Sequence, residues 1–177
     1  YCAINQHGIK DLKILQKLNA DNNKNICDVN HLANTLIELN CRDKCGINQD
    51  GIKDLKILRK LDTSCNETIN NVNHLANTLI KLECFDSWGI YKNGVNQDGI
   101  KDLKILRKLN AESNEKIYNV NHLKNTLTEL NCAGTKCGID QNGINDLKIL
   151  QKLNAKYNKK INNVNHLAST LIAYGWG

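Results

Sequence analysis

The sequence predicts an α/β repeat solenoid, a coil of short stacked units with a parallel sheet along one wall. Three observations support this: two blocks alternate four times, each block contains closely spaced leucines, and aromatic residues make up only 5% of the chain. The first block reads GIKDLKILRKL from Gly51 and recurs at Gly8, Gly99 and Gly143. The second reads VNHLANTLIEL from Val29 and recurs at Val72, Val120 and Val164.

Both blocks run into the same short piece, LxxLxL, which is too short for a helix and predicts a strand. One such unit cannot bury its apolar side alone, so neighbouring units must stack and place rows of leucine inside. We expect a single domain over 1–177, with eight units. Their strands should begin near residues 15, 36, 58, 79, 106, 127, 150 and 171.

The units resemble the leucine-rich-repeat family, whose pattern is LxxLxLxxNxxI with Asn or Cys at the ninth position. Leu58, Leu61, Thr63, Asn66 and Ile69 carry that pattern in one unit. The shorter units are similar to those of bacterial internalins. The resemblance implies a right-handed leucine-rich-repeat solenoid with a concave parallel sheet and short helical turns on the convex side.

The residues between the strands are expected to have structural roles in the turns. The ninth-position Asn is expected to pair backbone groups that the turn leaves open. Where Lys44 and Thr135 replace this Asn, we interpret Cys45 and Cys137 as substitutes in the ladder. The stretches DLKIL and NHLANTL are expected to cross the convex side as short helical turns. Asp-Gly and Asn-Gly pairs should mark the turns that enter them, at Asp50-Gly51, Asp98-Gly99 and Asn142-Gly143.

Positions 2, 3, 5, 7 and 8 of each unit are expected to point outward on the concave face. The third position alternates Lys and Glu over much of the chain, which suggests cross-strand pairs that keep this face soluble. Positions 7 and 8 differ from unit to unit, so packing does not constrain them. The single long insertion, residues 85–94, lies beside these positions and holds the only Phe.

These observations suggest a partner-binding site at the insertion, because aromatic side chains near charged groups are typical interface anchors. The alternative is a loop whose Trp packs over its own unit. The predicted site comprises Phe85, Asp86, Trp88 and Tyr91, with Arg59 and Arg107 on flanking strands and Tyr157 at a variable position.

The repeated histidines suggest a metal site and the repeated cysteines suggest disulfides, but their spacing argues against both. His31, His74, His122 and His166 recur once every two units, about 10 Å apart, too far to share a metal ion, so a structural role is expected. Cys41, Cys84 and Cys132 are spaced likewise and should be small buried apolar groups, although local pairs with Cys45 or Cys137 remain open. No motif indicates an enzyme, a metal or a cofactor. The unpaired cysteines, and a lone sequon whose Asn66 occupies the ladder position, favour an intracellular protein.

Charge and hydropathy limit the classes of partner that the chain is expected to bind. The net charge of +6 is spread along the chain without a run of Lys or Arg, which makes nucleic acid unlikely as a partner. No apolar stretch is long enough to span a membrane. We therefore expect a non-enzymatic scaffold that binds a protein.

The ends suggest an alternative function. Both ends lack the polar caps of solenoids, so the chain is either an excerpt of a longer array or a protein that self-assembles head to tail into a filament. The self-association residues would be Tyr1, Tyr174 and Trp176, of which Tyr174 and Trp176 could instead cap the last unit.

Overall fold

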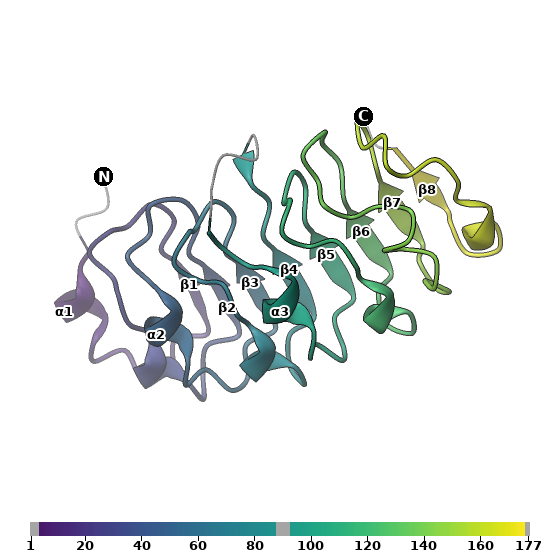
Figure 1. Ribbon diagram of the computed structural model, residues 1–177. Helices are drawn as coiled ribbons and strands as arrows, with labels where there is room; N and C mark the ends of the chain where they lie inside the picture. The colour runs from purple at the N-terminus through teal and green to yellow at the C-terminus, as the bar shows by residue number, and fades with distance from the viewer. Residues whose placement is uncertain (1–3, 88–92, 176–177) are drawn as a thin grey trace.

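Eight short strands lie side by side in one parallel sheet, in the order in which they follow along the chain. The structure is a computed structural model that describes residues 4–87 and 93–175. Figure 1 shows the strands as one wall of a coil that runs from the purple first repeat to the yellow last repeat. The strands are β1 Lys17–Asn19, β2 Glu38–Asn40, β3 Lys60–Asp62, β4 Lys81–Glu83, β5 Lys108–Asn110, β6 Glu129–Asn131, β7 Lys152–Asn154 and β8 Ala173–Tyr174.

The leucines at the centres of these strands form one buried row. Leu39 of β2 lies opposite Leu18 of β1 and Leu61 of β3, so like positions stack on like positions. Leu61 is 1% exposed and Leu82 is fully buried. Burial of a leucine side chain stabilises the fold by roughly 1.5–3 kcal/mol, and no unit achieves it without its neighbours. The predicted solenoid is confirmed, and each strand begins two residues after its expected start.

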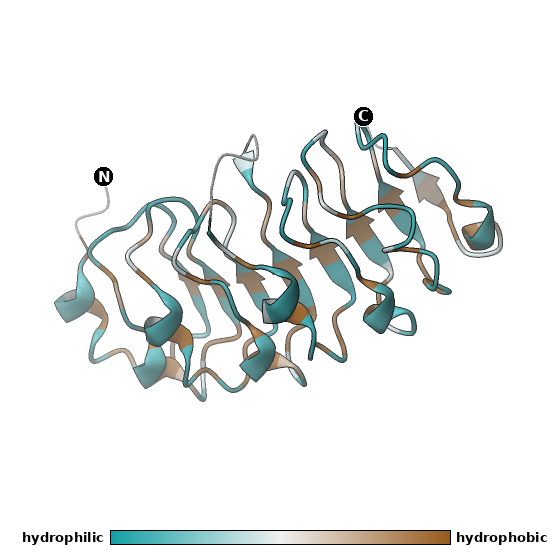
Figure 2. Cartoon of the chain, in the orientation of Figure 1, coloured by the Kyte–Doolittle hydropathy of each residue, from teal (hydrophilic) through white to brown (hydrophobic). Residues whose placement is uncertain are grey.

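Helical turns cross the side of the coil opposite the sheet (Figure 1). They are mostly hydrophilic, while hydrophobic segments recur in every repeat (Figure 2). In the second block the turns are 3-10 helices, as the NHLANTL stretch predicts. The described α-helical turns are α1 Gln6–Ile9, α2 Gln49–Ile52 and α3 Gln97–Ile100, and the 3-10 turns are η1 Asn30–Leu32, η2 Asn73–Leu75, η4 Asn121–Leu123 and η5 Asn165–Leu167.

The prediction for the first block was wrong by a few residues, because its helical turn precedes DLKIL. Gly51 lies inside α2 and does not mark its entry; Asn48 caps the turn by accepting a hydrogen bond from Gly51 N at 3.0 Å. Glycine is required there because a Cβ would collide with the carbonyl oxygen of Cys27 in the preceding unit. The DLKIL residues then lead into β3, with Leu55 and Leu58 buried.

The ninth-position asparagines form a buried ladder along the coil, as predicted. Asn158 donates hydrogen bonds to the carbonyl oxygens of Cys132 and Ile139, both at 2.9 Å. Cys137 takes the same place in a unit without the Asn, where its Sγ donates to the carbonyl oxygen of Ala111 at 3.5 Å. These side chains tie each unit to the one before it.

Candidate functional site

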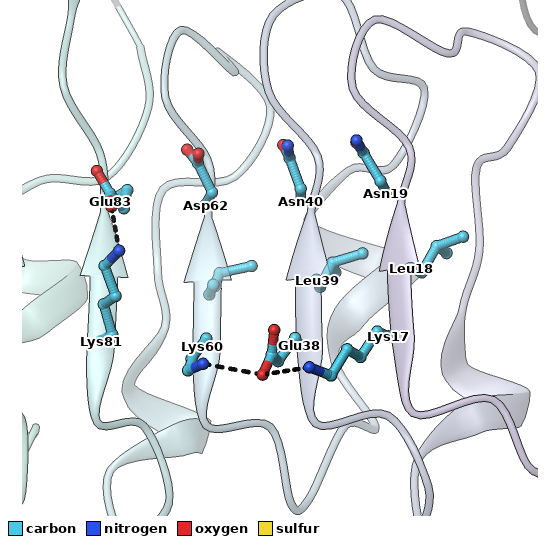
Figure 3. Close-up of a pocket in the computed structure, with 11 residues that line it drawn as sticks. Lys17, Leu18, Asn19, Glu38, Leu39, Asn40, Lys60, Asp62, Lys81 and Glu83 are labelled. Atoms are coloured by element: carbon cyan, nitrogen blue, oxygen red, sulfur yellow. Dashed lines mark hydrogen bonds and ion pairs between the residues drawn. The ribbon is translucent and has the colours of Figure 1, made fainter.

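A ladder of charged side chains runs along the concave face at the first residue of strands β1 to β7. The Glu38 carboxylate lies 3.2 Å from Lys17 Nζ and 2.9 Å from Lys60 Nζ, so it bridges three strands (Figure 3). The hydrogen bonds from Lys60 and Lys17 lower the pKa of Glu38 below its ordinary value. The cross-strand pairing expected for this face is present here.

The same arrangement recurs at the other end of the sheet. The Glu129 carboxylate lies 3.0 Å from Lys108 Nζ and 3.3 Å from Lys152 Nζ. Partial burial raises the pKa of Glu129, but the hydrogen bonds from both lysines outweigh it, so the pKa lies below its ordinary value. Each glutamate therefore remains ionised well below neutral pH.

Strand β4 interrupts this alternation. Lys81 occupies the place that Glu38 and Glu129 hold in their strands, and it pairs with Glu83 of its own strand at 2.6 Å. Glu83 also accepts a hydrogen bond from Asn110 Nδ2 at 2.9 Å. The charged face over β1–β4 is hollowed, with a volume of about 400 Å³ (Figure 3).

A second hollow lies beyond the carboxyl ends of β4–β7, where the loops leave the sheet. Its volume is about 570 Å³. Phe85 and Tyr157 line it, and hydroxyl and charged groups lie among the other lining residues, including Ser113, Glu112 and Lys136. The structure thus brings together three of the predicted site residues, Phe85, Asp86 and Tyr157, from the units of β4 and β7.

Phe85 is held from the concave side by a cation. The guanidinium carbon of Arg42 lies 5.0 Å from the centre of the Phe85 ring. Arg42 Nε also lies 3.8 Å from the Asp62 carboxylate. A cation over an aromatic face stabilises the pair by about 0.5–1 kcal/mol at exposed sites, so Arg42 restrains the ring beside the hollow. Arg42 was missed as a site residue, although it stands at one of the variable positions.

The expectation that positions 7 and 8 all point outward was wrong at several units. Asp86 is 5% exposed, and its carboxylate lies 3.9 Å from Lys116 Nζ. Ser64, Cys65 and Ala133 are buried as well. The reason is that these turns pack on the next unit, as Cys65 N does by donating to the carbonyl oxygen of Phe85 at 3.0 Å. Asp86 therefore lies against the wall of the hollow and presents little surface.

Tyr157 occupies a backbone conformation that a bulky residue seldom adopts. Its φ is +64°, in the left-handed region, and the residue is 68% exposed. The equivalent residues Asn22, Asp43 and Ser113 also have positive φ but carry short polar side chains. For a residue with a Cβ this conformation costs roughly 1–2 kcal/mol. The positive φ is a feature of this turn in several units, and what is particular to Tyr157 is its exposed aromatic side chain.

The remaining predicted residues do not join this group. Arg59 and Arg107 are exposed and precede β3 and β5, at the opposite ends of the strands from Phe85. Trp88 and Tyr91 lie outside the described residues, as do Tyr1 and Trp176. Tyr174 lies in β8 and is 55% exposed.

The repeated histidines have structural partners, as expected. His74 Nε2 lies 3.0 Å from the carbonyl oxygen of Ile52, and His31, His122 and His166 repeat this contact. Burial lowers the pKa of His74, which favours the neutral ring. Over the described ranges, no three His, Cys, Asp or Glu residues come together as metal ligands.

The cysteines within the described ranges are free thiols, so neither local pair is oxidised. Cys41, Cys84 and Cys132 are buried as predicted, and burial raises the pKa of each thiol. Burial also raises the pKa of Cys137, to about 11. No helix in 4–87 or 93–175 has the length and apolar character needed to cross a membrane.

The stacked parallel strands, the asparagine ladder and the short convex turns define a leucine-rich-repeat solenoid. The chain has the internalin-like form of that fold: it is similar to internalin C2 of Listeria monocytogenes str. 4b F2365, with a TM-score of 0.55 and 20% sequence identity. The match covers 94% of this chain and 72% of internalin C2. No family model matches the sequence, and neither does any curated protein.

Proposed function

We propose that this chain is a non-enzymatic scaffold that binds a protein partner through its concave face and the hollow between Phe85 and Tyr157. One observation carries the proposal. The hollow lies where the repeat is broken, beside the insertion that follows β4. Most positions of a solenoid repeat from unit to unit because packing requires it. A segment that departs from the repeat is free of that requirement and can bind a partner.

The chemistry of the hollow supports a protein partner. Phe85 and Tyr157 line the hollow together with hydroxyl and charged groups. Interfaces combine such anchors with polar groups that fix the orientation of the partner. Phe85 is restrained by Arg42, so little freedom is lost on binding.

The non-enzymatic part of the proposal rests on how the reactive side chains are used. Each repeated imidazole is engaged by a backbone carbonyl group, as His122 is by Ile100 at 3.0 Å. The buried thiols have raised pKa values, so they are protonated at neutral pH and are poor nucleophiles. These groups stabilise the coil.

The test is a selection of displayed protein domains on the purified chain, followed by affinity measurements with two variants. Phe85→Ala combined with Tyr157→Ala should weaken binding by about tenfold or more, because anchor truncation costs on the order of 2 kcal/mol. Tyr118→Ala is the matched control, since Tyr118 is 58% exposed and does not line the hollow. A third variant, Trp88→Ala with Tyr91→Ala, tests the rest of the insertion. Selected domains that bind the first variant as tightly as the unaltered chain would overturn the proposal.

Self-assembly is the second candidate, and exposed apolar residues at both ends favour it. Ile14, before β1, is 87% exposed, and Ile172, before β8, is 76% exposed. Both end strands have one unpaired edge. Stacking of the first repeat of one copy on the last repeat of another would cover both surfaces and extend the sheet. Sedimentation over a range of concentrations should then show polymers that Ile172→Asp abolishes; a monomer at every concentration contradicts the idea.

A further inference from the structure

The unit that contains β4 inverts the charge pattern of the concave face. Strands β2 and β6 read Glu-Leu-Asn, whereas β4 reads Lys-Leu-Glu. A cation thus replaces a carboxylate at one end of the strand, and a carboxylate replaces an amide at the other. The neighbouring strand β3 likewise ends in Asp62 where β1, β5 and β7 end in Asn. These changes in charge all lie in the units of β3 and β4, next to the insertion.

The inversion places like charges side by side. Lys81 lies opposite Lys60 on one side and Lys108 on the other. Adjacent strands are about 4.8 Å apart, and like charges directly opposite each other destabilise a sheet. A glutamate at this place would relieve the repulsion, as Glu38 and Glu129 do in their strands. Glu83 of the same strand offsets part of this repulsion by pairing with Lys81 at 2.6 Å.

Two arginines enlarge this group of cations. Arg59 and Arg107 come immediately before Lys60 and Lys108, and both are exposed. Neither guanidinium group has an ion pair with any residue in 4–87 or 93–175. Half-buried Ile80 lies between them in the sheet, since Ile80 N donates to Arg59 O and Arg107 N donates to Ile80 O, both at 2.9 Å. We name Arg59, Lys60, Lys81, Arg107 and Lys108 the basic cluster.

We propose that the basic cluster binds an extended acidic segment of the protein partner. The inference rests on the proposed function and specifies the chemistry of the partner. Glu38, Glu83 and Glu129 already engage the three lysines, which leaves a modest excess of positive charge. That excess suits a few carboxylates, whereas nucleic acids and sulfated polymers require many cation contacts. Each lysine ammonium group has three N–H donors, so it can also donate a hydrogen bond to a carboxylate of the bound segment.

The spacing of the cluster sets the form of the segment. Two strand spacings make it about 10 Å wide along the coil. In an extended chain, alternate side chains lie about 6.5–7 Å apart on one side. Two carboxylates at alternate positions can therefore both reach the cluster. Asp62 lies at the other end of β3 and repels the segment toward the row of lysines, whereas the Glu83 carboxylate contacts Lys81 Nζ directly, at 2.6 Å.

The test uses a fluorescein-labelled peptide of alternating Glu and Gly, followed by fluorescence anisotropy, with a Gln and Gly peptide as its control. The Glu peptide should bind and the Gln peptide should not. Lys81→Glu places a carboxylate between Lys60 and Lys108, as Glu38 and Glu129 are placed between their lysines, so the variant should fold, and it should weaken binding by about tenfold or more. Lys53→Glu makes the same change of charge at the exposed end of α2 and should alter affinity by less than about twofold, because α2 lies on the side of the coil opposite the sheet (Figure 1).

Failure of this inference is distinguishable from failure of the proposed function. The variant with Phe85→Ala and Tyr157→Ala should keep its affinity for the Glu peptide, since those residues lie at the other ends of the strands. The inference is overturned if Lys81→Glu leaves peptide binding unchanged, or if a heparin fragment or an oligonucleotide binds more tightly than the peptide in a Lys81-dependent way. Domains selected through the hollow would still support the scaffold in either case.

Discussion

Asn66 Nδ2 lies 2.8 Å from the carbonyl oxygen of Cys41, although 25 residues separate the two in the chain. The same amide donates to the carbonyl oxygen of Ile47 at 3.1 Å, and Asn66 Oδ1 accepts from Thr68 N at 2.9 Å. One side chain thus closes its own turn and satisfies two carbonyl groups of the preceding unit. Asn66 is 3% exposed, so a glycan cannot be attached there in the folded chain.

Replacement of Asn66 should therefore destabilise the whole coil. Asn66→Ala leaves the Cys41 carbonyl oxygen and Thr68 N without their partner, while the Ile47 carbonyl oxygen keeps Thr68 Oγ1 at 3.3 Å. Each lost partner costs about 1–3 kcal/mol, so we expect a loss of roughly 2–4 kcal/mol in the free energy of unfolding. Urea denaturation measures this loss. The control is Asn77→Ala, because Asn77 is exposed, and its effect should stay within about 0.5 kcal/mol. Equal losses in both variants would contradict the role of the ladder.

A glycine pair gives a second prediction about packing between units. A Cβ on Gly51 would collide with the carbonyl oxygen of Cys27, whereas a Cβ on Gly8 would meet Ile4 Cγ2 at 3.4 Å and Asn5 Oδ1 at 3.9 Å, both ordinary contacts. Gly51→Ala should lower the free energy of unfolding by about 1–3 kcal/mol through overpacking. Gly8→Ala should be neutral or stabilising by up to about 1 kcal/mol, because alanine favours the helical turn. Similar losses at both glycines would mean that close contact between units is not the cause.

Tyr157 should show opposite effects on stability and on binding. Asn tolerates the left-handed backbone that Tyr157 adopts, so Tyr157→Asn should raise the free energy of unfolding by up to about 1 kcal/mol. The same substitution removes an aromatic wall of the hollow and should weaken binding of the selected partner. Calorimetry and the affinity assay test the two effects separately. A variant that is less stable than the unaltered chain would show that the tyrosine serves packing.

Two of the repeated histidines, His74 and His122, make stability depend on pH. Burial lowers the pKa of His74 and of His122 from the ordinary value of 6.5, so the unfolded chain binds protons more readily than the folded chain. Their stabilisation is complete above pH 6.5 and is lost as the pH falls through the lower, folded-state pKa. The thermal midpoint should therefore fall from pH 7 to pH 5. His74→Gln with His122→Gln should flatten that slope; an unchanged slope would assign the effect to other groups.

Much of the fold could be predicted from the sequence, because stacking requires like positions to repeat. The buried Leu39 and Leu61, the ladder at Asn66 and the structural role of His74 all follow from spacing, which also places each strand to within two residues. The helical turn at Gly51 was placed too late, since the contact with Cys27 in the preceding unit decides which residue must be glycine. Phe85 of the insertion lines a hollow, and the burial of Asp86 depends on Lys116 of the next unit, which the sequence pattern does not specify.

What the sequence by itself determined is a coil of stacked leucine units, since each unit can bury its apolar side only against a copy of itself. What only the tertiary structure decided is which variable side chains meet. Phe85 and Tyr157 share a hollow because the loops beyond β4–β7 pack on one another, and Arg59 and Arg107 flank Ile80 because β3, β4 and β5 pair in register. These contacts depend on the path of the loops and the register of the strands, and the residue spacing within one unit predicts neither.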